Sequence, residues 1–290
     1  MKYVAPTSVD EARSLLADNP GSRVFAGATD LIPQMRSGRP APSLIVDLKR
    51  IDQLIALGHD AGSWSIGAAA PTSMLTRDAG FSAMFPGLSE AAGLIGSDQI
   101  QNRSSLGGNL CNASPAADSV PSMIANGLQA VIASGDGTRT AAVADVVTGP
   151  GQTSLADGEF IVEFTAADTP ANTSDAYLRM IPRTEMDIAV VGAAVRLTVD
   201  GGVISDASVV LGAVAPTAVS VPDAEAALNG ATVDGGTIDD ATLAAVAEAA
   251  SAACNPIDDK RGTIVYRRQV AGVLAKRAAN IAAQRAQNGA

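Results

Sequence analysis

The sequence has very few of the residues from which metal centres and disulfide frameworks are built. Its 290 residues include one histidine, His59, and two cysteines, Cys111 and Cys254. Zinc, haem iron and iron-sulfur clusters need several His or Cys ligands at close spacing, and two remote cysteines cannot supply them. Two cysteines also form no disulfide framework, which favours a reducing compartment. The sequence still allows one long-range disulfide between Cys111 and Cys254. We expect no metal site in this chain.

Basic charge and long apolar runs are scarce as well. The chain has 20 Lys and Arg against 30 Asp and Glu, a net charge of −10. Nucleic-acid binding depends on clustered basic residues, so we expect no nucleic-acid partner. The longest uncharged stretch, residues 119–135, is too short for a membrane span, and acidic residues stand where a signal peptide has its apolar core. We therefore expect a cytoplasmic protein that is not integral to a membrane.

Several catalytic motifs are missing too. There is no P-loop, no G-x-S-x-G nucleophile elbow and no H-E-x-x-H. His59 stands in Gly58-His59-Asp60-Ala61-Gly62, which predicts an exposed turn rather than a catalytic site. We predict no catalytic residue in this chain.

Apolar runs separated by turn residues predict an α+β protein in two domains. Ser8-x-x-Glu11 is typical of a helix start, and Asp200-Gly201-Gly202 is typical of a hairpin. A polar stretch, residues 166–175, marks the boundary between a first domain, 1–172, with lobes of about 1–58 and 59–172, and a second domain, 176–288. The predicted strands are 23–26 (buried), 44–48, 64–68, 128–133, 139–143, 160–164, 188–199 and 203–214, and the predicted helices are 9–17, 30–36, 72–77, 88–95, 119–126, 223–228, 239–253 and 262–285.

Two glycine-containing segments carry the strongest functional signal. In the first, residues 24–31, a strand passes through a Gly turn into a helix start, which can point successive backbone N–H groups at an anion such as a pyrophosphate. In the second, residues 104–109, paired glycines allow close approach of a ligand, and Ser and Asn supply polar groups. Either segment alone is more typical of ordinary strand-to-helix architecture than of a ligand site.

Together, the two segments resemble those of the FAD-binding medium subunit of the molybdenum hydroxylases. This family includes the carbon monoxide dehydrogenase flavoprotein and the flavin domain of xanthine dehydrogenase. Its A-G-G-x-[ST]-[DE]-L loop is similar to residues 26–31. Its R-N-x-x-[ST]-[IVL]-G-G-N segment is similar to residues 102–109, with Asn102 and Arg103 transposed, and continues to Ala113, Pro115 and Asp118. Weaker similarity at 149–161 and 183–191 extends the resemblance over nearly the whole chain.

The resemblance implies a two-lobed FAD-binding module of the vanillyl-alcohol oxidase type (PCMH-like), followed by an α+β C-terminal domain of the CO dehydrogenase flavoprotein type. It also implies which residues bind FAD. The pyrophosphate and ribityl chain would be held by the two segments, with hydroxyl hydrogen bonds from Thr29 and Ser105. Asp118 would make a polar contact to the flavin, Ile95 and Ile161 would form apolar walls, and Arg179 stands where many members have Lys. The full set is Phe25, Ala26, Gly27, Ala28, Thr29, Asp30, Leu31, Ile95, Ser105, Leu106, Gly107, Gly108, Asn109, Asp118, Ile161 and Arg179.

Two positions depart from the family's pattern. Ala28 stands where members often have Gly, and a positive φ there would cost on the order of 1 kcal/mol. Ile188 stands where the carbon monoxide branch has an aromatic residue over the flavin, which weakens an assignment to carbon monoxide.

The function implied by the resemblance is electron transfer within a heteromeric enzyme. The chain would carry FAD, accept electrons from iron-sulfur clusters of a small partner subunit, and pass them to NAD, a quinone or another acceptor. The substrate, an aldehyde, an N-heterocycle or purine, or CO, would be oxidised at a molybdenum-pterin site in a large partner subunit. The alternative is a self-sufficient FAD-dependent oxidase or reductase of the same fold, with His59 and Cys111 as the local candidates for catalysis or a covalent tether. A scaffold without a cofactor is a third reading.

Overall fold

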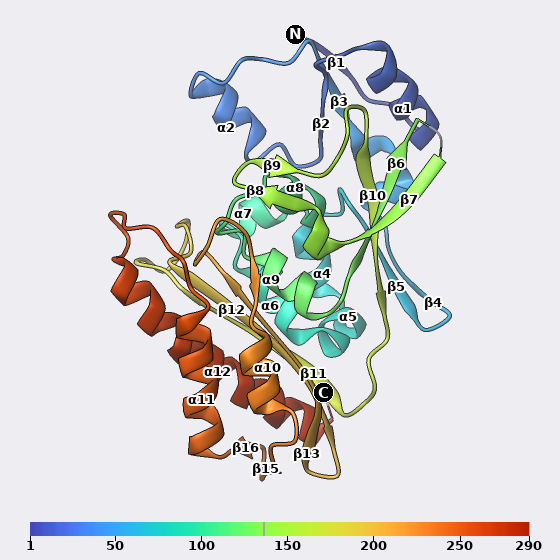
Figure 1. Cartoon of the computed structure of the whole chain (residues 1–290). Coiled ribbons are helices and arrows are strands. Elements are labelled where there is room, and N and C mark those ends of the chain that lie inside the picture. Colours follow the sequence, from blue (N-terminus) through green and yellow to red (C-terminus); the bar gives the residue numbers. More distant parts are fainter. Residues whose placement is uncertain (136, 290) are drawn as a thin grey trace.

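Three larger β-sheets follow one another along the chain, and two small sheets, β8–β9 and β15–β16, have two strands each (Figure 1). The computed structural model describes residues 1–135 and 137–289. The larger sheets have three, five and four strands in chain order, and each is packed with helices. This arrangement confirms the predicted α+β class.

The first lobe is built on a small parallel sheet. Its elements are β1 (Lys2–Val4), α1 (Val9–Asp18), β2 (Arg23–Phe25), α2 (Leu31–Arg36), β3 (Leu44–Asp47), a 3₁₀ turn η1 (Leu48–Arg50) and α3 (Asp52–Ile55). The strand order is β1–β3–β2, with both pairs parallel. Only the central strand is fully buried, so the prediction of a buried strand at 23–26 was wrong: β2 is an edge strand and is half-buried.

The start of α1 confirms the helix signal in the sequence. The Ser8 hydroxyl accepts a hydrogen bond from the Glu11 N–H at 3.1 Å, and the Glu11 carboxylate accepts one from the Thr7 N–H at 2.8 Å. The first contact caps the helix, and the second resembles the other half of a capping box but reaches Thr7, one residue before the N-cap.

The second lobe has an antiparallel sheet in the order β4–β5–β10–β6–β7. Its strands and turns are β4 (Leu57–Asp60), β5 (Ser63–Gly67), β6 (Gln129–Ser134), β7 (Gly137–Ala142), η2 (Val143–Asp145), β8 (Val147–Gly149), β9 (Gln152–Thr153) and β10 (Phe160–Ala167). Its helices are α4 (Thr72–Arg77), α5 (Ala79–Met84), α6 (Pro86–Gly93), α7 (Asp98–Gln101), α8 (Leu106–Cys111) and α9 (Ser119–Ala125). The core between this sheet and its helices includes four of the fully buried large side chains, Phe81, Phe85, Leu88 and Phe164.

The C-terminal part has a sheet in the order β11–β12–β13–β14 and long helices. Its elements are β11 (Thr173–Met180), β12 (Val191–Asp200), β13 (Val203–Gly212), β14 (Val219–Ser220), α10 (Pro222–Leu228), β15 (Val233–Asp234), β16 (Thr237–Ile238), α11 (Asp240–Ala252) and α12 (Ile264–Asn288). Strands β12 and β13 pair antiparallel across Gly201 and Gly202, which confirms the predicted hairpin. β12 begins at Val191, later than predicted, because Ile188 lies in an exposed connection.

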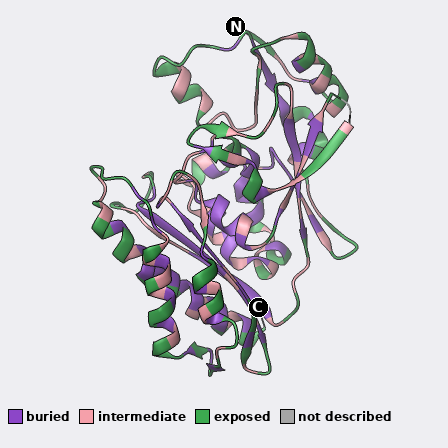
Figure 2. Cartoon of the chain, in the orientation of Figure 1, coloured by how far each residue is buried: buried purple, intermediate pink, exposed green. Residues whose placement is uncertain are grey.

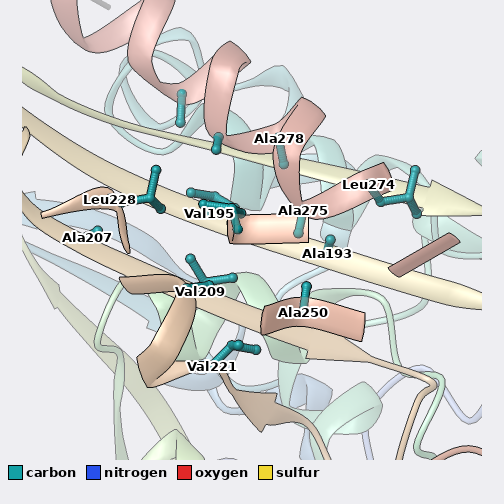
Figure 3. Close-up of a cluster of buried hydrophobic side chains, with 14 of the residues drawn as sticks. Ala193, Val195, Ala207, Val209, Val221, Leu228, Ala250, Leu274, Ala275 and Ala278 are labelled. Carbon is teal, nitrogen blue, oxygen red and sulfur yellow. The ribbon is translucent and has the colours of Figure 1, made fainter. Parts of the chain in front are cut away.

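The C-terminal sheet is covered on both faces. Figure 3 shows one face, where small side chains such as Ala193 and Val195 meet Ala275 and Ala278 of α12. On the other face, Tyr177 and Ala194 pack against Ala91 of α6 and Ala125 of α9. Figure 2 accordingly shows β12 buried along most of its length. This sheet therefore fastens the C-terminal part to the second lobe.

Three polar residues of the predicted boundary stretch lie inside a strand. Thr173, Ser174 and Asp175 are buried at the start of β11, so the connection after β10 is shorter than expected. The Asp175 carboxylate accepts hydrogen bonds from the N–H groups of Gly87 and Leu88, at 2.8 and 3.0 Å. These partners come from a helix far away in the sequence, so local polarity could not reveal them. The predicted end of the first domain, residue 172, immediately precedes β11.

Candidate functional site

The first glycine-containing segment forms the loop between β2 and α2. Its backbone includes one residue in the left-handed region, Ala28, with a φ of +60°. An Ala side chain in this conformation costs on the order of 1 kcal/mol relative to the right-handed region. The departure from the family's glycine is therefore accompanied by the strain that we expected.

The N–H groups of this loop are its most distinctive feature. The carbonyls of Ala28 and Asp30 accept hydrogen bonds from Ile32 and Gln34, at 3.2 and 3.0 Å. Within the described chain, however, no hydrogen bond uses a backbone N–H of residues 27–31. Five successive donors without protein partners, at the start of a helix, can together bind an anionic group such as a phosphate.

The predicted side chains of this loop lie in different environments. Asp30 is exposed, but the surrounding protein desolvates its carboxylate enough to raise its pKa. Thr29 and Leu31 are half-buried. The Phe25 ring faces the Lys49 ammonium, with 4.2 Å from Nζ to the ring centroid. Phe25 therefore belongs to the support of the loop as well as to its sequence motif.

The second glycine-containing segment is a short helix, α8, which the sequence did not predict. Ser105 is its N-cap, and its buried hydroxyl accepts a hydrogen bond from the Gly108 N–H at 3.1 Å. The Asn109 side-chain oxygen accepts a hydrogen bond from the Ser119 hydroxyl at 2.7 Å. Leu106 is buried in the core of the second lobe. Much of this segment is thus committed to the protein's own packing.

The two glycines of α8 have different surroundings. A Cβ on Gly107 would lie 2.5 Å from the carbonyl oxygen of Ala68, and the Gly107 N–H donates a hydrogen bond to that oxygen. Gly108 is exposed, and a Cβ there would meet only the Ser105 hydroxyl, at 3.2 Å. Packing within the chain explains the first glycine, whereas the open side of the second leaves room for a ligand.

The structure brings the two segments together. A Cβ on Gly27 would lie 1.8 Å from the carbonyl oxygen of Arg103, so the first loop touches the residues that lead into α8. The Gln34 side chain of α2 also donates a hydrogen bond to Asn112, just after α8, at 2.8 Å. These contacts join the first and second lobes at the predicted pyrophosphate site.

Two further predicted residues, Asp118 and Arg179, form a buried ion pair. Arg179 donates from one guanidinium nitrogen to Asp118 and to the Leu94 carbonyl, both at 2.8 Å. The Tyr177 hydroxyl donates to the other Asp118 oxygen at 3.0 Å. Burial raises the pKa of Asp118 to about 6, against the opposing effects of the Arg179 charge and the Tyr177 hydrogen bond. Since Asp118 precedes α9 and Arg179 lies on β11, the pair spans the junction with the C-terminal sheet.

The two residues predicted to form apolar walls, Ile95 and Ile161, have different surroundings. Ile95 is half-buried and stands next to Leu94, which contacts Arg179. The chain after β11 returns to this place, since the Met186 N–H donates to the Gly96 carbonyl at 3.3 Å. Ile161 lies instead on β10, in the core of the second lobe, and is 3% exposed. Contacts of the chain next to Ile95 thus connect it with Arg179, whereas Ile161 belongs to the core of the second lobe.

His59 and Cys111, the candidate residues for a self-sufficient enzyme, each have contacts that account for them without a catalytic role. His59 lies on strand β4, not in a turn as predicted, because residues 57–60 pair with β5. It is exposed, its ring stacks on Trp64 with centroids 4.7 Å apart, and Nε2 lies 2.9 Å from Asp168. Cys111 ends α8 and is exposed as a residue, but the protein around its thiol desolvates it and raises its pKa to about 12, which disfavours the reactive thiolate.

The sequence reasoning missed two residues of the site region, Tyr177 and Lys49. Tyr177 reaches Asp118 from a strand in another part of the chain, and no local signal marks that contact. Lys49 donates a hydrogen bond to the Ala26 carbonyl at 2.7 Å. The acidic residue within the apolar run 44–48 was an available signal, because Asp47 pairs with Lys49.

Clusters of metal ligands and long apolar helices are absent from the part of the chain that the structure describes. No three His, Cys, Asp or Glu side chains gather there in a way that could hold a metal ion. No helix among the described residues is long and apolar enough to cross a membrane. One cavity of about 20 Å³, lined by residues that include Pro115 and Val120, has room for about one water molecule.

Comparison with known families divides the chain into two matched parts. Residues 1–165 match the family described as the FAD binding domain in molybdopterin dehydrogenase. Residues 176–282 match the family described as the CO dehydrogenase flavoprotein C-terminal domain.

Individual relatives match over most of their length. The carbon monoxide dehydrogenase medium chain of Hydrogenophaga pseudoflava is 31% identical, covering 97% of this chain and 96% of the relative. The xanthine dehydrogenase FAD-binding subunit of Escherichia coli O157:H7 is 32% identical over 77% of each chain. Among solved structures, a chain of carbon monoxide dehydrogenase from H. pseudoflava superimposes with a TM-score of 0.91 at 33% identity, covering 97% of this chain and 96% of that one. A chain of quinoline 2-oxidoreductase from Pseudomonas putida 86 gives 0.90 at 29% identity, over 99% and 98%.

Proposed function

Since this chain belongs to the family of FAD-binding subunits of molybdopterin-dependent dehydrogenases, we propose that it carries FAD as the electron-transfer subunit of a heteromeric molybdenum hydroxylase. The observation that carries the assignment of the FAD site is the set of backbone N–H groups at residues 27–31 without protein partners. A pyrophosphate has the charge and the acceptor atoms that such a set requires. The loop therefore fits the phosphate part of FAD.

The second segment completes the proposed phosphate site. Gly27 brings the first loop against Arg103, so the exposed face of Gly108 and the loop belong to one region. Ser105 keeps a hydroxyl proton for donation, because its oxygen accepts the Gly108 N–H. In this arrangement backbone atoms and a buried hydroxyl hold the cofactor, which explains why a chain with few basic residues can bind two phosphates.

Asp118 and Arg179 serve the proposed flavin end of the site. Arg179 reaches the Leu94 carbonyl next to Ile95, and Asp118 balances most of its charge. Both carboxylate oxygens of Asp118 already accept hydrogen bonds, but a carboxylate can accept more than two. The pair thus supplies a rigid polar boundary between the second lobe and the C-terminal sheet.

When bound, FAD supplies the redox chemistry, and the protein supplies its position and electrostatic environment. We assign no catalytic acid or base to this chain. We further propose that a small iron-sulfur subunit donates the electrons and that a large molybdenum subunit oxidises the substrate. NAD, a quinone or another compound would be the acceptor, and the cytoplasm would be the location. The named relatives act on chemically different substrates, so the substrate class, whether aldehyde, N-heterocycle, purine or CO, is set by the large subunit.

The test is FAD binding by the purified full-length chain. We expect a yellow protein, or one that becomes yellow with added FAD, whose flavin is released by acid precipitation. A chain that stays colourless in excess FAD would overturn the assignment. Flavin that remains with the acid precipitate would instead support the self-sufficient oxidase with a covalent tether.

The heteromeric assignment has its own test. We expect the native chain to copurify with a subunit that contains iron and acid-labile sulfide and another that contains molybdenum. A flavin-loaded chain that purifies without either subunit and oxidises a substrate unaided would contradict this part of the proposal.

A further inference from the structure

Lys49 stands directly behind the first glycine loop. It belongs to η1, just after the central strand β3, and its side chain is 22% exposed. Its ammonium donates a hydrogen bond to the Ala26 carbonyl at 2.7 Å and one to Asp47 at 2.5 Å. The same ammonium lies over the Phe25 ring, 4.2 Å from its centroid. The Ala26 carbonyl, the Asp47 carboxylate and the Phe25 ring therefore hold the Lys49 ammonium in one place.

Asp47 is itself held firmly. It is 6% exposed, and its carboxylate accepts hydrogen bonds from the Tyr3 hydroxyl at 2.6 Å and from the Lys49 N–H at 3.0 Å. Burial disfavours the ionised carboxylate, but the hydrogen bonds from Lys49 and Tyr3 outweigh this effect and lower the pKa of Asp47. Lys49 thus has a fixed counter-ion, so that its position does not depend on a bound ligand.

The contact with Ala26 bears on the direction of the next N–H group. The peptide unit between Ala26 and Gly27 is planar and trans, so its C=O and N–H point in opposite directions. A carbonyl that points toward Lys49 therefore turns the Gly27 N–H away from Lys49. Gly27 is the first of the five residues whose N–H groups have no protein partner.

We propose that Lys49 is a positioning residue, which orients the Ala26–Gly27 peptide and so sets the loop 27–31 to receive the pyrophosphate of FAD. This inference rests on the proposed function. Lys49 acts through the Ala26 carbonyl and not by contact with the cofactor. Without the Lys49 side chain, the Ala26–Gly27 peptide would be free to rotate and the N–H groups would not converge. The loop would then have to be ordered on binding, and this cost would weaken FAD binding.

The experiment is an FAD titration of Lys49→Met in the full-length chain, prepared free of flavin. Arg50→Met is the matched control, because it removes the same charge one residue further along η1 from an exposed side chain. We expect the dissociation constant to rise about 10- to 100-fold in Lys49→Met, as for loss of a hydrogen bond from a charged donor, and to change little in Arg50→Met. Lys49→Arg, which keeps the charge and a donor, should recover most of the affinity.

A salt series separates positioning from simple charge attraction. Long-range attraction between Lys49 and the phosphates would be screened by salt, so the deficit of Lys49→Met would shrink as ionic strength rises. A positioning role predicts the same deficit at low and high salt. A deficit that vanishes in high salt, or an equal deficit in Arg50→Met, would overturn the inference.

The outcomes also separate this inference from the proposed function. A parent chain that binds FAD beside a Lys49→Met variant of equal affinity would overturn the inference alone. A parent chain without affinity for FAD would overturn the proposed function and the inference with it. If Lys49→Met does not fold, Lys49→Gln decides the matter: it is too short to hold the Ala26 carbonyl, and parent-like affinity in it would refute the positioning role.

Discussion

The two glycine segments of the proposed FAD site are constructed in opposite ways. Within the described chain, the loop 27–31 leaves its N–H groups without protein partners and contains a strained Ala28. The segment 105–109 forms the start of α8, with a capped N-terminus and a buried leucine. One segment is incomplete without a ligand, whereas the other is largely complete by itself.

The lobes that carry the two segments differ in the same sense. The first loop extends from an edge strand of a three-stranded sheet and depends on Lys49 and on the neighbouring lobe for support. Helix α8 packs into the core of the second lobe through Leu106 and Leu110. The second segment therefore provides a rigid platform, and the first loop lies against it. Substitutions in the two segments should therefore separate stability from cofactor affinity.

Gly27→Ala should have the largest effect, because it affects both properties. The new Cβ would lie 1.8 Å from the Arg103 carbonyl, so the loop and the α8 platform must move apart. We expect the free energy of unfolding to fall by about 2 to 3 kcal/mol and FAD binding to be lost. Urea unfolding and FAD titration measure the two effects. Gly149→Ala, whose Cβ would be 3.4 Å from the flexible Gln152 side chain, is the control and should change neither.

Gly108→Val should affect cofactor affinity much more than stability. Gly108 is exposed, and a Cβ there meets only the Ser105 hydroxyl. The branched side chain would occupy the space where the pyrophosphate approaches, so we expect FAD affinity to fall at least about tenfold, for a stability change below about 1 kcal/mol. Gly107→Ala should lower stability much more than FAD affinity, because its Cβ would lie 2.5 Å from the Ala68 carbonyl oxygen. Equal flavin content in Gly108→Val and parent protein would remove this residue from the site.

Ser105→Ala tests whether the platform also contributes a ligand. Loss of the N-cap should lower the free energy of unfolding by about 1 kcal/mol. Ser8→Ala removes an equivalent N-cap from α1, with the same 3.1 Å hydrogen bond. Both variants should lose similar stability in thermal unfolding, but only Ser105→Ala should bind FAD more weakly. If Ser8→Ala lost as much FAD affinity as Ser105→Ala, Ser105 would act only as a helix cap.

Ala28→Gly should have the smallest effect, and it is favourable to stability. Glycine adopts a φ of +60° without strain, so we expect a gain of up to about 1 kcal/mol. Ala61→Gly, at a φ of +49° in the β4–β5 turn, should give a similar gain. A change in FAD affinity confined to Ala28→Gly would show that the strained residue shapes the loop. A loss of stability in both variants would mean that the greater entropy of glycine in the unfolded chain outweighs the relief of strain.

Local signals in the sequence predicted most of the helices and strands. The Ser8 cap, the Gly201–Gly202 hairpin and the apolar run of β3 act within a few residues, so each can be read along the chain. Buried polar residues could not be read in this way. Asp175 looked like part of a linker because its partners, the N–H groups of Gly87 and Leu88, belong to another part of the chain.

At the candidate site, too, the sequence predicted local features but not contacts between distant residues. The two motifs predicted both glycine segments, and the family resemblance added roles for Asp118 and Arg179. Neither predicted the contact of Asp118 with Arg179 or of Lys49 with Ala26. The second motif also gave Gly107 and Gly108 the same role. Only packing distinguishes them, since one faces the Ala68 carbonyl and the other faces open space.

By itself, the scarcity of histidine and cysteine determined that this chain has too few ligands to build a metal cluster, and its two motifs determined its resemblance to flavin-carrying subunits. Residue types and short spacings carry that information, because ligand chemistry and turn conformation are local properties. Only the packed structure shows which backbone N–H groups of the described chain have no protein partner, which of the two glycines of α8 faces open space, and which cation contacts the loop. Those properties depend on contacts between residues that are distant in the chain, and such contacts exist only once the lobes have packed together.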